Sequence, residues 1–120
     1  NGIVRVCWDG AADADFSEPD PVPGLGGIDL TISGSFSMLV NITTDHDVEY
    51  TFRIYSGASG ESERLLQVPD VGDDSLPQIF LLTFDSFTGD GSFNSVDAIE
   101  MVINFNISGA IDTAVNLITI

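Results

Sequence analysis

The sequence predicts an all-β protein, an antiparallel β-sandwich or jelly roll of about eight short strands. Apolar and polar residues alternate with a period of two in several segments, which is typical of strands that bury one face. Gly residues separate these segments, and the acidic residues are mostly Asp, which favours turns, whereas Glu favours helices. The length of 120 residues fits one domain with a single core.

Two segments are expected to anchor the core. Residues 35–43 and residues 48–55 both alternate strictly, and only a short turn at residues 44–46 separates them. We therefore expect them to pair as a hairpin. Their apolar sides are Phe36, Met38, Val40 and Ile42 in the first segment and Val48, Tyr50, Phe52 and Ile54 in the second.

A third alternating segment covers residues 98–107, with Glu100 on its polar side. A helix capped by Ser95 is the alternative, because several apolar residues there also share helical spacing. Abundant β-branched residues and two Asn favour the strand. Weaker strands are expected at residues 28–33, 63–68, 78–84 and 112–120, with almost no helix elsewhere.

The N-terminal part divides into a strand, residues 1–8, and an acidic linker with Pro and Gly, residues 9–27, ahead of a sandwich core, residues 28–120. So long a connection is unusual in a compact domain and can act as a tether. The first strand then pairs either within its own chain or in a neighbouring molecule by strand addition. The residues expected at that interface are Ile3, Val4, Arg5, Val6, Cys7 and Trp8.

The net charge of −16, from three Arg, no Lys and nineteen acidic residues, argues against nucleic acid and anionic membranes as partners. No apolar run is long enough for a membrane span. Clustered Asp residues suggest Ca²⁺, with Asp70, Asp73 and Asp74 in a Gly-containing turn as the candidate ligands. The alternative is that these carboxylates are solvated and only form turns.

The sequence shows no catalytic constellation, and we expect no enzyme. The single His46 lies between two Asp in a turn with no nucleophile placed to use it. Cys7 lies on an apolar strand and is expected to pack as a small hydrophobe. Among aromatic residues, Tyr55 is the best candidate for contacting a sugar, because it lies on the polar side of its strand. Phe87 and Phe93 are expected to plug the end of the sandwich.

Several motifs carry a family resemblance. These are Gly-Gly-Ile-Asp-Leu-Thr at residues 26–31, the strand at 36–42, Phe-Thr-Gly-Asp-Gly-Ser-Phe-Asn-Ser-Val-Asp-Ala-Ile-Glu at 87–100, and the final strand. The chain resembles secreted bacterial β-sandwich proteins of the exosortase-sorted PEP-CTERM type, although it contains no sorting tail. This resemblance implies an exported surface or matrix protein. The chain starts at Asn1 and stops in an apolar stretch, and we expect it to be a mature segment of a secreted precursor.

Together these observations predict an extracellular, non-enzymatic structural protein on a bacterial surface. We expect a homopolymeric subunit of a filament, sheath or matrix that assembles by β-strand donation. The alternative is a calcium-dependent carbohydrate-binding module that recognises an extracellular polysaccharide.

Overall fold

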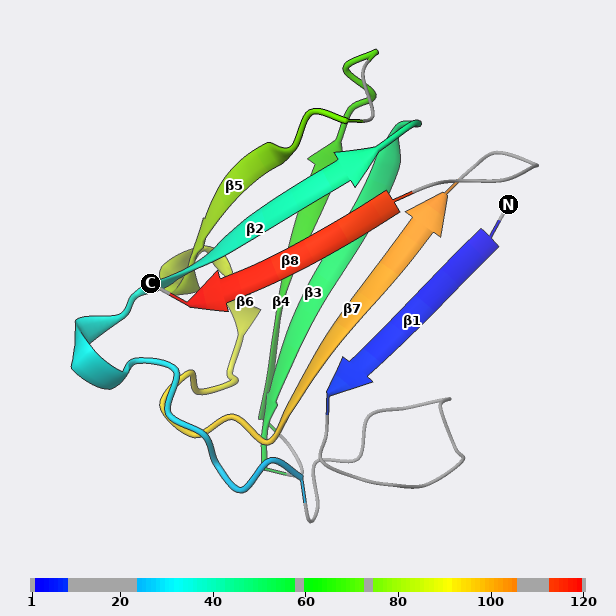
Figure 1. The fold of residues 1–120 in the computed structure, drawn as a ribbon. Coiled ribbons are helices and arrows are strands. Elements are labelled where there is room, and N and C mark those ends of the chain that lie inside the picture. Colours follow the sequence, from blue (N-terminus) through cyan, green and yellow to red (C-terminus); the bar gives the residue numbers. More distant parts are fainter. Residues whose placement is uncertain (1, 9–23, 58–59, 73–74, 106–112, 120) are drawn as a thin grey trace.

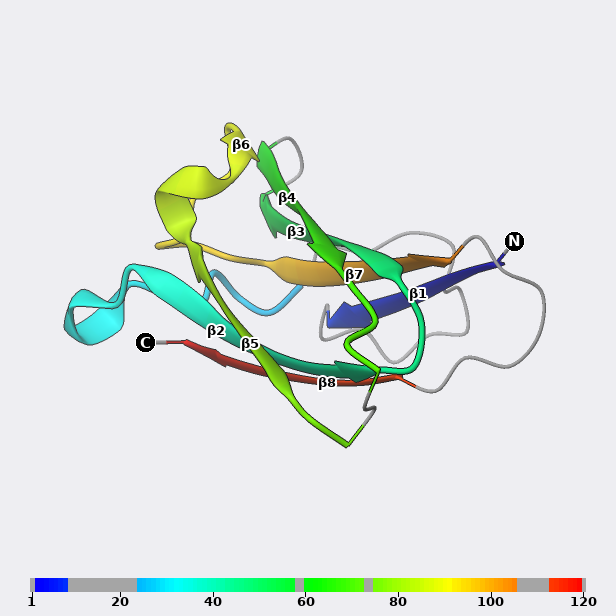
Figure 2. The same cartoon turned by 90° about the horizontal axis from the view of Figure 1, so that it is seen from above.

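The computed structural model describes residues 2–8, 24–57, 60–72, 75–105 and 113–119. Two antiparallel sheets pack face to face (Figures 1 and 2), which confirms the predicted antiparallel β-sandwich. The strands are β1 (Gly2–Trp8), β2 (Ser37–Thr44), β3 (Val48–Ser56), β4 (Gly60–Val68), β5 (Gln78–Thr83), β6 (Thr88–Gly89), β7 (Ala98–Phe105) and β8 (Thr113–Thr119). Within these ranges there is no α-helix, only the 3₁₀ turns η1 (Ile32–Gly34) and η2 (Phe84–Ser86).

The larger sheet has the strand order β1-β7-β3-β4-β6, and the smaller has the order β5-β2-β8. The prediction of a strand rather than a helix after Ser95 is confirmed, since β7 pairs with β1 on one side and with β3 on the other. Figure 1 shows β1 at one border of the molecule, next to β7. The first strand thus pairs within its own chain in this structure, and its exchange with a neighbour stays a prediction.

The predicted hairpin between β2 and β3 is wrong, because the two strands belong to different sheets. Residues 45–47 carry the chain across the sandwich, and Thr44, only 1% exposed, donates a hydrogen bond from Oγ1 to the carbonyl of His46 at 2.9 Å. The apolar sides of β2 and β3 face each other across the core. Alternation identifies the buried face of a strand, but it does not choose the strand's neighbour in a sheet.

Both anchoring strands fill the core as predicted. Val40, Ile42, Tyr50 and Ile54 are completely buried, and burying such a side chain contributes roughly 1.5–3 kcal/mol. The exception is Phe36, whose side chain is 65% exposed because β2 begins only at Ser37.

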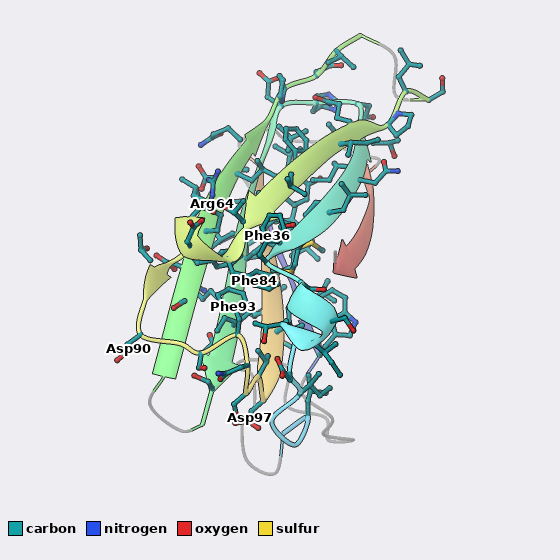
Figure 3. The ribbon with its side chains drawn as sticks, turned by 90° about the vertical axis from the view of Figure 1, so that its left-hand side faces the viewer. Phe36, Arg64, Phe84, Asp90, Phe93 and Asp97 are labelled. Carbon is teal, nitrogen blue, oxygen red and sulfur yellow. The ribbon has the colours of Figure 1, made fainter. Side chains whose placement is uncertain are left out.

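Aromatic rings close one end of the sandwich. Phe93 stacks on Phe84 with ring centroids 4.2 Å apart and meets Phe87 edge-on at 5.0 Å. Phe87 belongs to the buried core, and the other two rings pack against it. Figure 3 shows Phe36, Phe84 and Phe93 gathered in this region. The positions of Phe87 and Phe93 agree with the expected plug.

The strand predicted at residues 28–33 does not form. Ile28 makes an isolated bridge with Val96, after which the chain turns through η1, where Ser33 and Gly34 have φ of 58° and 80°. Left-handed residues cannot continue a strand. The sequence also gave no sign of β6, whose Gly89 pairs with Ser62 of β4.

Candidate functional site

The most unusual side chain of the sandwich is Glu100, which lies on the outer face of the larger sheet and yet is only 1% exposed. Its Oε2 lies 2.9 Å from Arg5 Nε of β1. Its Oε1 accepts a hydrogen bond from Arg53 Nη1 of β3 at 2.9 Å and another from the Tyr55 hydroxyl at 3.2 Å. The carboxylate therefore joins its own strand to both neighbouring strands.

The network continues across the sheet. Arg53 also donates from Nε to Glu63 Oε2 of β4 at 2.9 Å, and Glu61 Oε1 lies 3.7 Å from the same nitrogen. One ladder of charges thus crosses β1, β7, β3 and β4. It includes two of the three Arg residues of the chain, which has no Lys.

The environment of the network shifts two pKa values. Burial lowers the pKa of Arg53, but the hydrogen bonds and charges of Glu100 and Glu63 outweigh it, so the pKa rises above the ordinary value. Burial, together with the negative charges of Glu100 and Glu61, raises the pKa of Tyr55 to about 12. Both residues therefore keep the protonation states that bind Glu100 throughout the neutral range.

This geometry gives the sequence-predicted residue Tyr55 a structural partner. Its hydroxyl donates to Glu100, and the residue is half-buried. A sugar would have to compete with that carboxylate for the hydroxyl. The buried position of Glu100 itself was not predicted, because alternation placed it on the polar side of its strand. Its burial is made tolerable by the arginines from β1 and β3 and by the Tyr55 hydroxyl.

The six residues expected at a strand-donation interface all belong to β1. Ile3, Val4 and Trp8 are 67%, 45% and 42% exposed, respectively, whereas Val6 and Cys7 are half-buried and Val6 packs against the core. Arg5 reaches Glu100. Among the described contacts, the strand is held by its ladder with β7, by the packing of Val6 on the core and by the ion pair of Arg5 with Glu100, while Ile3, Val4 and Trp8 remain accessible.

The predicted calcium ligands are placed only in part. Asp70 accepts a hydrogen bond from the Gly72 amide at 2.8 Å, and its own amide donates to Asp47 at 2.7 Å; Asp73 and Asp74 lie outside the described residues. Where side chains are described, no group of three potential metal ligands surrounds one point. The calcium site stays a prediction.

Other acidic residues tie loops together. Asp97 accepts hydrogen bonds from the amides of Gly27 at 2.8 Å and Gly57 at 2.6 Å, and Asp90 accepts one from the Glu61 amide at 3.2 Å. Figure 3 shows Asp90 in the loop after β6 and Asp97 at the lower end of the sandwich.

His46 lies in the turn between β2 and β3, with Nδ1 2.8 Å from Asp45 Oδ1.

The exposed ring of Phe36 borders a hollow of about 400 Å³ beside the aromatic plug. Its lining residues are Thr31, Ser35, Phe36, Thr83, Phe84 and Asp85. Sequence reasoning missed this hollow because it assigned Phe36 to the core. A ring, several hydroxyls and a carboxylate around one depression can contact a ligand that is apolar on one face and polar at its rim.

Comparisons with known proteins identify no relative. No protein-family model, curated protein or solved structure matches the chain. In the described part of the chain, no helix is both long and apolar enough to cross a membrane. The fold and the geometry of the β1–β7 edge are therefore the basis for any functional conclusion.

Proposed function

We propose that this protein is an extracellular structural subunit that assembles with copies of itself into a filament, sheath or matrix by donating β1 to the β7 edge of a neighbour. The observation that supports this proposal most is the position of β1. It is an edge strand paired with β7, and its side chains at Ile3, Val4 and Trp8 are 42–67% exposed. Little apolar surface ties it to its own core, so the same contacts are available in another copy.

The tether has the length that donation needs. Trp8 pairs with Ile99, and the Leu25 amide donates to the Asp97 carbonyl at 2.7 Å, so both ends of the connecting segment lie beside the start of β7. The sixteen residues between them can span about 50 Å when extended. The longest dimension of the molecule is 39 Å. The connection is therefore much longer than closure within one chain requires.

The protein concentration determines whether β1 pairs with β7 of its own chain, the closed state, or with β7 of a neighbour, the donated state. A covalent tether of this length gives the attached strand an effective concentration in the millimolar range, so a dilute chain closes on itself. Donation dominates where copies are crowded, as they are in a surface layer. The charge of −16 opposes such crowding, and we expect salt to promote assembly by screening it. No Lys protects the strand edges against pairing.

Deleting residues 1–8 tests the proposal. The truncated chain should remain monomeric in light scattering and electron microscopy under conditions in which the full chain forms polymers. Since truncation exposes the β7 edge and can unfold the domain, a second variant keeps β1 in place. Ile3 and Asn104 lie directly opposite each other, so Ile3→Cys with Asn104→Cys, in a Cys7→Ser background, locks β1 to its own chain when oxidised.

The locked chain should stay monomeric when oxidised and assemble when reduced. Its control is Cys7→Ser alone, which should assemble under both conditions. Normal polymers formed by the oxidised locked chain would contradict donation of β1.

Carbohydrate binding is the second candidate function, favoured by the exposed ring of Phe36 at the hollow. Aromatic faces stack on sugar rings, while hydroxyls and Asp85 can bond sugar hydroxyls. A glycan array with the monomeric chain tests this function. Retention lost in Phe36→Ala but kept in Tyr55→Ala places the sugar in the hollow, and the reverse places it at Tyr55. An array without specific retention removes this candidate.

A further inference from the structure

The two oxygens of Glu100 have different partners. Oε1 is held within the larger sheet, by Arg53 and Tyr55 of β3. Oε2 faces β1 and lies 2.9 Å from Arg5. One oxygen of this buried carboxylate therefore has its partners on β3, which stays beside β7. The other oxygen has its partner on β1, the strand that the proposed function makes exchangeable.

Arg5 is the one charged residue in β1, whose sequence is otherwise Gly-Ile-Val and Val-Cys-Trp. Apolar residues on both faces allow β1 to slide along β7 at little cost in burial. A slip of one residue turns Arg5 toward the core, where its charge has no partner. A slip of two residues moves it by about 6.6 Å along the strand, well beyond the 2.9 Å contact with Glu100.

We infer that Glu100 is the recognition point for a β1 strand from a second copy of this chain, accepting that copy's Arg5 and fixing the register of the added strand. This inference rests on the proposed function. It identifies the partner by charge, since the incoming strand must carry a cation at one position. Of the chain's three cations, Arg53 is bound to Glu63 and Glu100, and Arg64 donates to Ser86 at 3.1 Å.

A pair of charge reversals tests this recognition. In Arg5→Glu, position 5 and Glu100 repel each other, and in Glu100→Arg, position 100 and Arg5 repel each other, so neither variant can seat its own strand. In an equimolar mixture, every interface between unlike chains joins opposite charges. We expect each variant alone to assemble at least tenfold less than the wild type, and the mixture to regain alternating polymers in native mass spectrometry.

A milder series guards against misfolding of the reversed variants. Arg5→Gln in the chain would weaken the closed and the donated pairing of β1 alike, so this substitution is made in a labelled peptide of residues 1–8 that competes with β1 of the wild-type chain. Arg5→Gln should weaken capture of the peptide about tenfold, with partial recovery in Arg5→Lys. Arg64→Gln in the chain makes the same charge change away from β1, and this chain should capture the wild-type peptide normally.

The outcomes separate the two proposals. If the wild type assembles but the Arg5→Gln peptide is captured as well as the wild-type peptide and the mixture of reversed chains stays unassembled, the role of Glu100 is wrong, while assembly itself stands. If the wild type never assembles, both proposals fail.

Discussion

Replacing Glu100 with Gln removes the charge on which the ion-pair ladder converges and nearly preserves the size of the side chain. Removing one partner from a fully buried ion pair costs about 3–5 kcal/mol. The Glu100 side chain is 1% exposed, but Arg5 and Arg53 are 38% and 28% exposed, so water solvates them once the carboxylate is lost. We therefore expect the free energy of unfolding to fall by about 2–3 kcal/mol.

Urea titration followed by circular dichroism measures this loss, which corresponds to roughly 10 °C in melting temperature for a domain of this size. Glu63→Gln is the matched control, because it removes the same charge and also contacts Arg53, but its side chain is 48% exposed. It should cost less than about 1 kcal/mol. If Glu100→Gln costs no more than Glu63→Gln, burial of the carboxylate does not stabilise the sheet as we reason.

Three further predictions concern pH, backbone geometry and metal. Because the pKa of Tyr55 is raised to about 12, its contribution to stability is complete below pH 10 and is lost as the pH rises toward 12, and Tyr55→Phe should flatten that fall in urea titrations. Gly89→Ala should cost about 2 kcal/mol or more in the same assay, because its Cβ would lie 2.1 Å from the Glu61 carbonyl oxygen; Gly34→Ala, with a positive φ but open space, should cost about 1 kcal/mol. If the turn at Asp70 binds Ca²⁺, EDTA at fixed ionic strength should lower the melting temperature, and an unchanged melt would remove the calcium site.

Sequence alone determined most of the strands, though not the failed strand at residues 28–33 or β6, and for the long alternating strands it determined which face is buried. Val40 and Phe52 lie in the core because every second residue of a strand points to the same side. The long connection after Trp8 is likewise visible in the sequence, as is the lack of Lys at the strand edges. These properties are local, and periodicity and composition report them directly.

Only the tertiary structure decided how the strands combine. Alternation made β2 and β3 look like a hairpin, but their apolar faces meet across the sandwich, because period two specifies a face and not a neighbour. Glu100 shows the same limit for a site. Alternation correctly placed Glu100 on the polar side of β7. Its burial, however, depends on Arg5, which lies near the other end of the sequence, and on Arg53 of β3. A charge can be buried only where opposite charges converge on it, and that convergence exists only once the sheet has assembled.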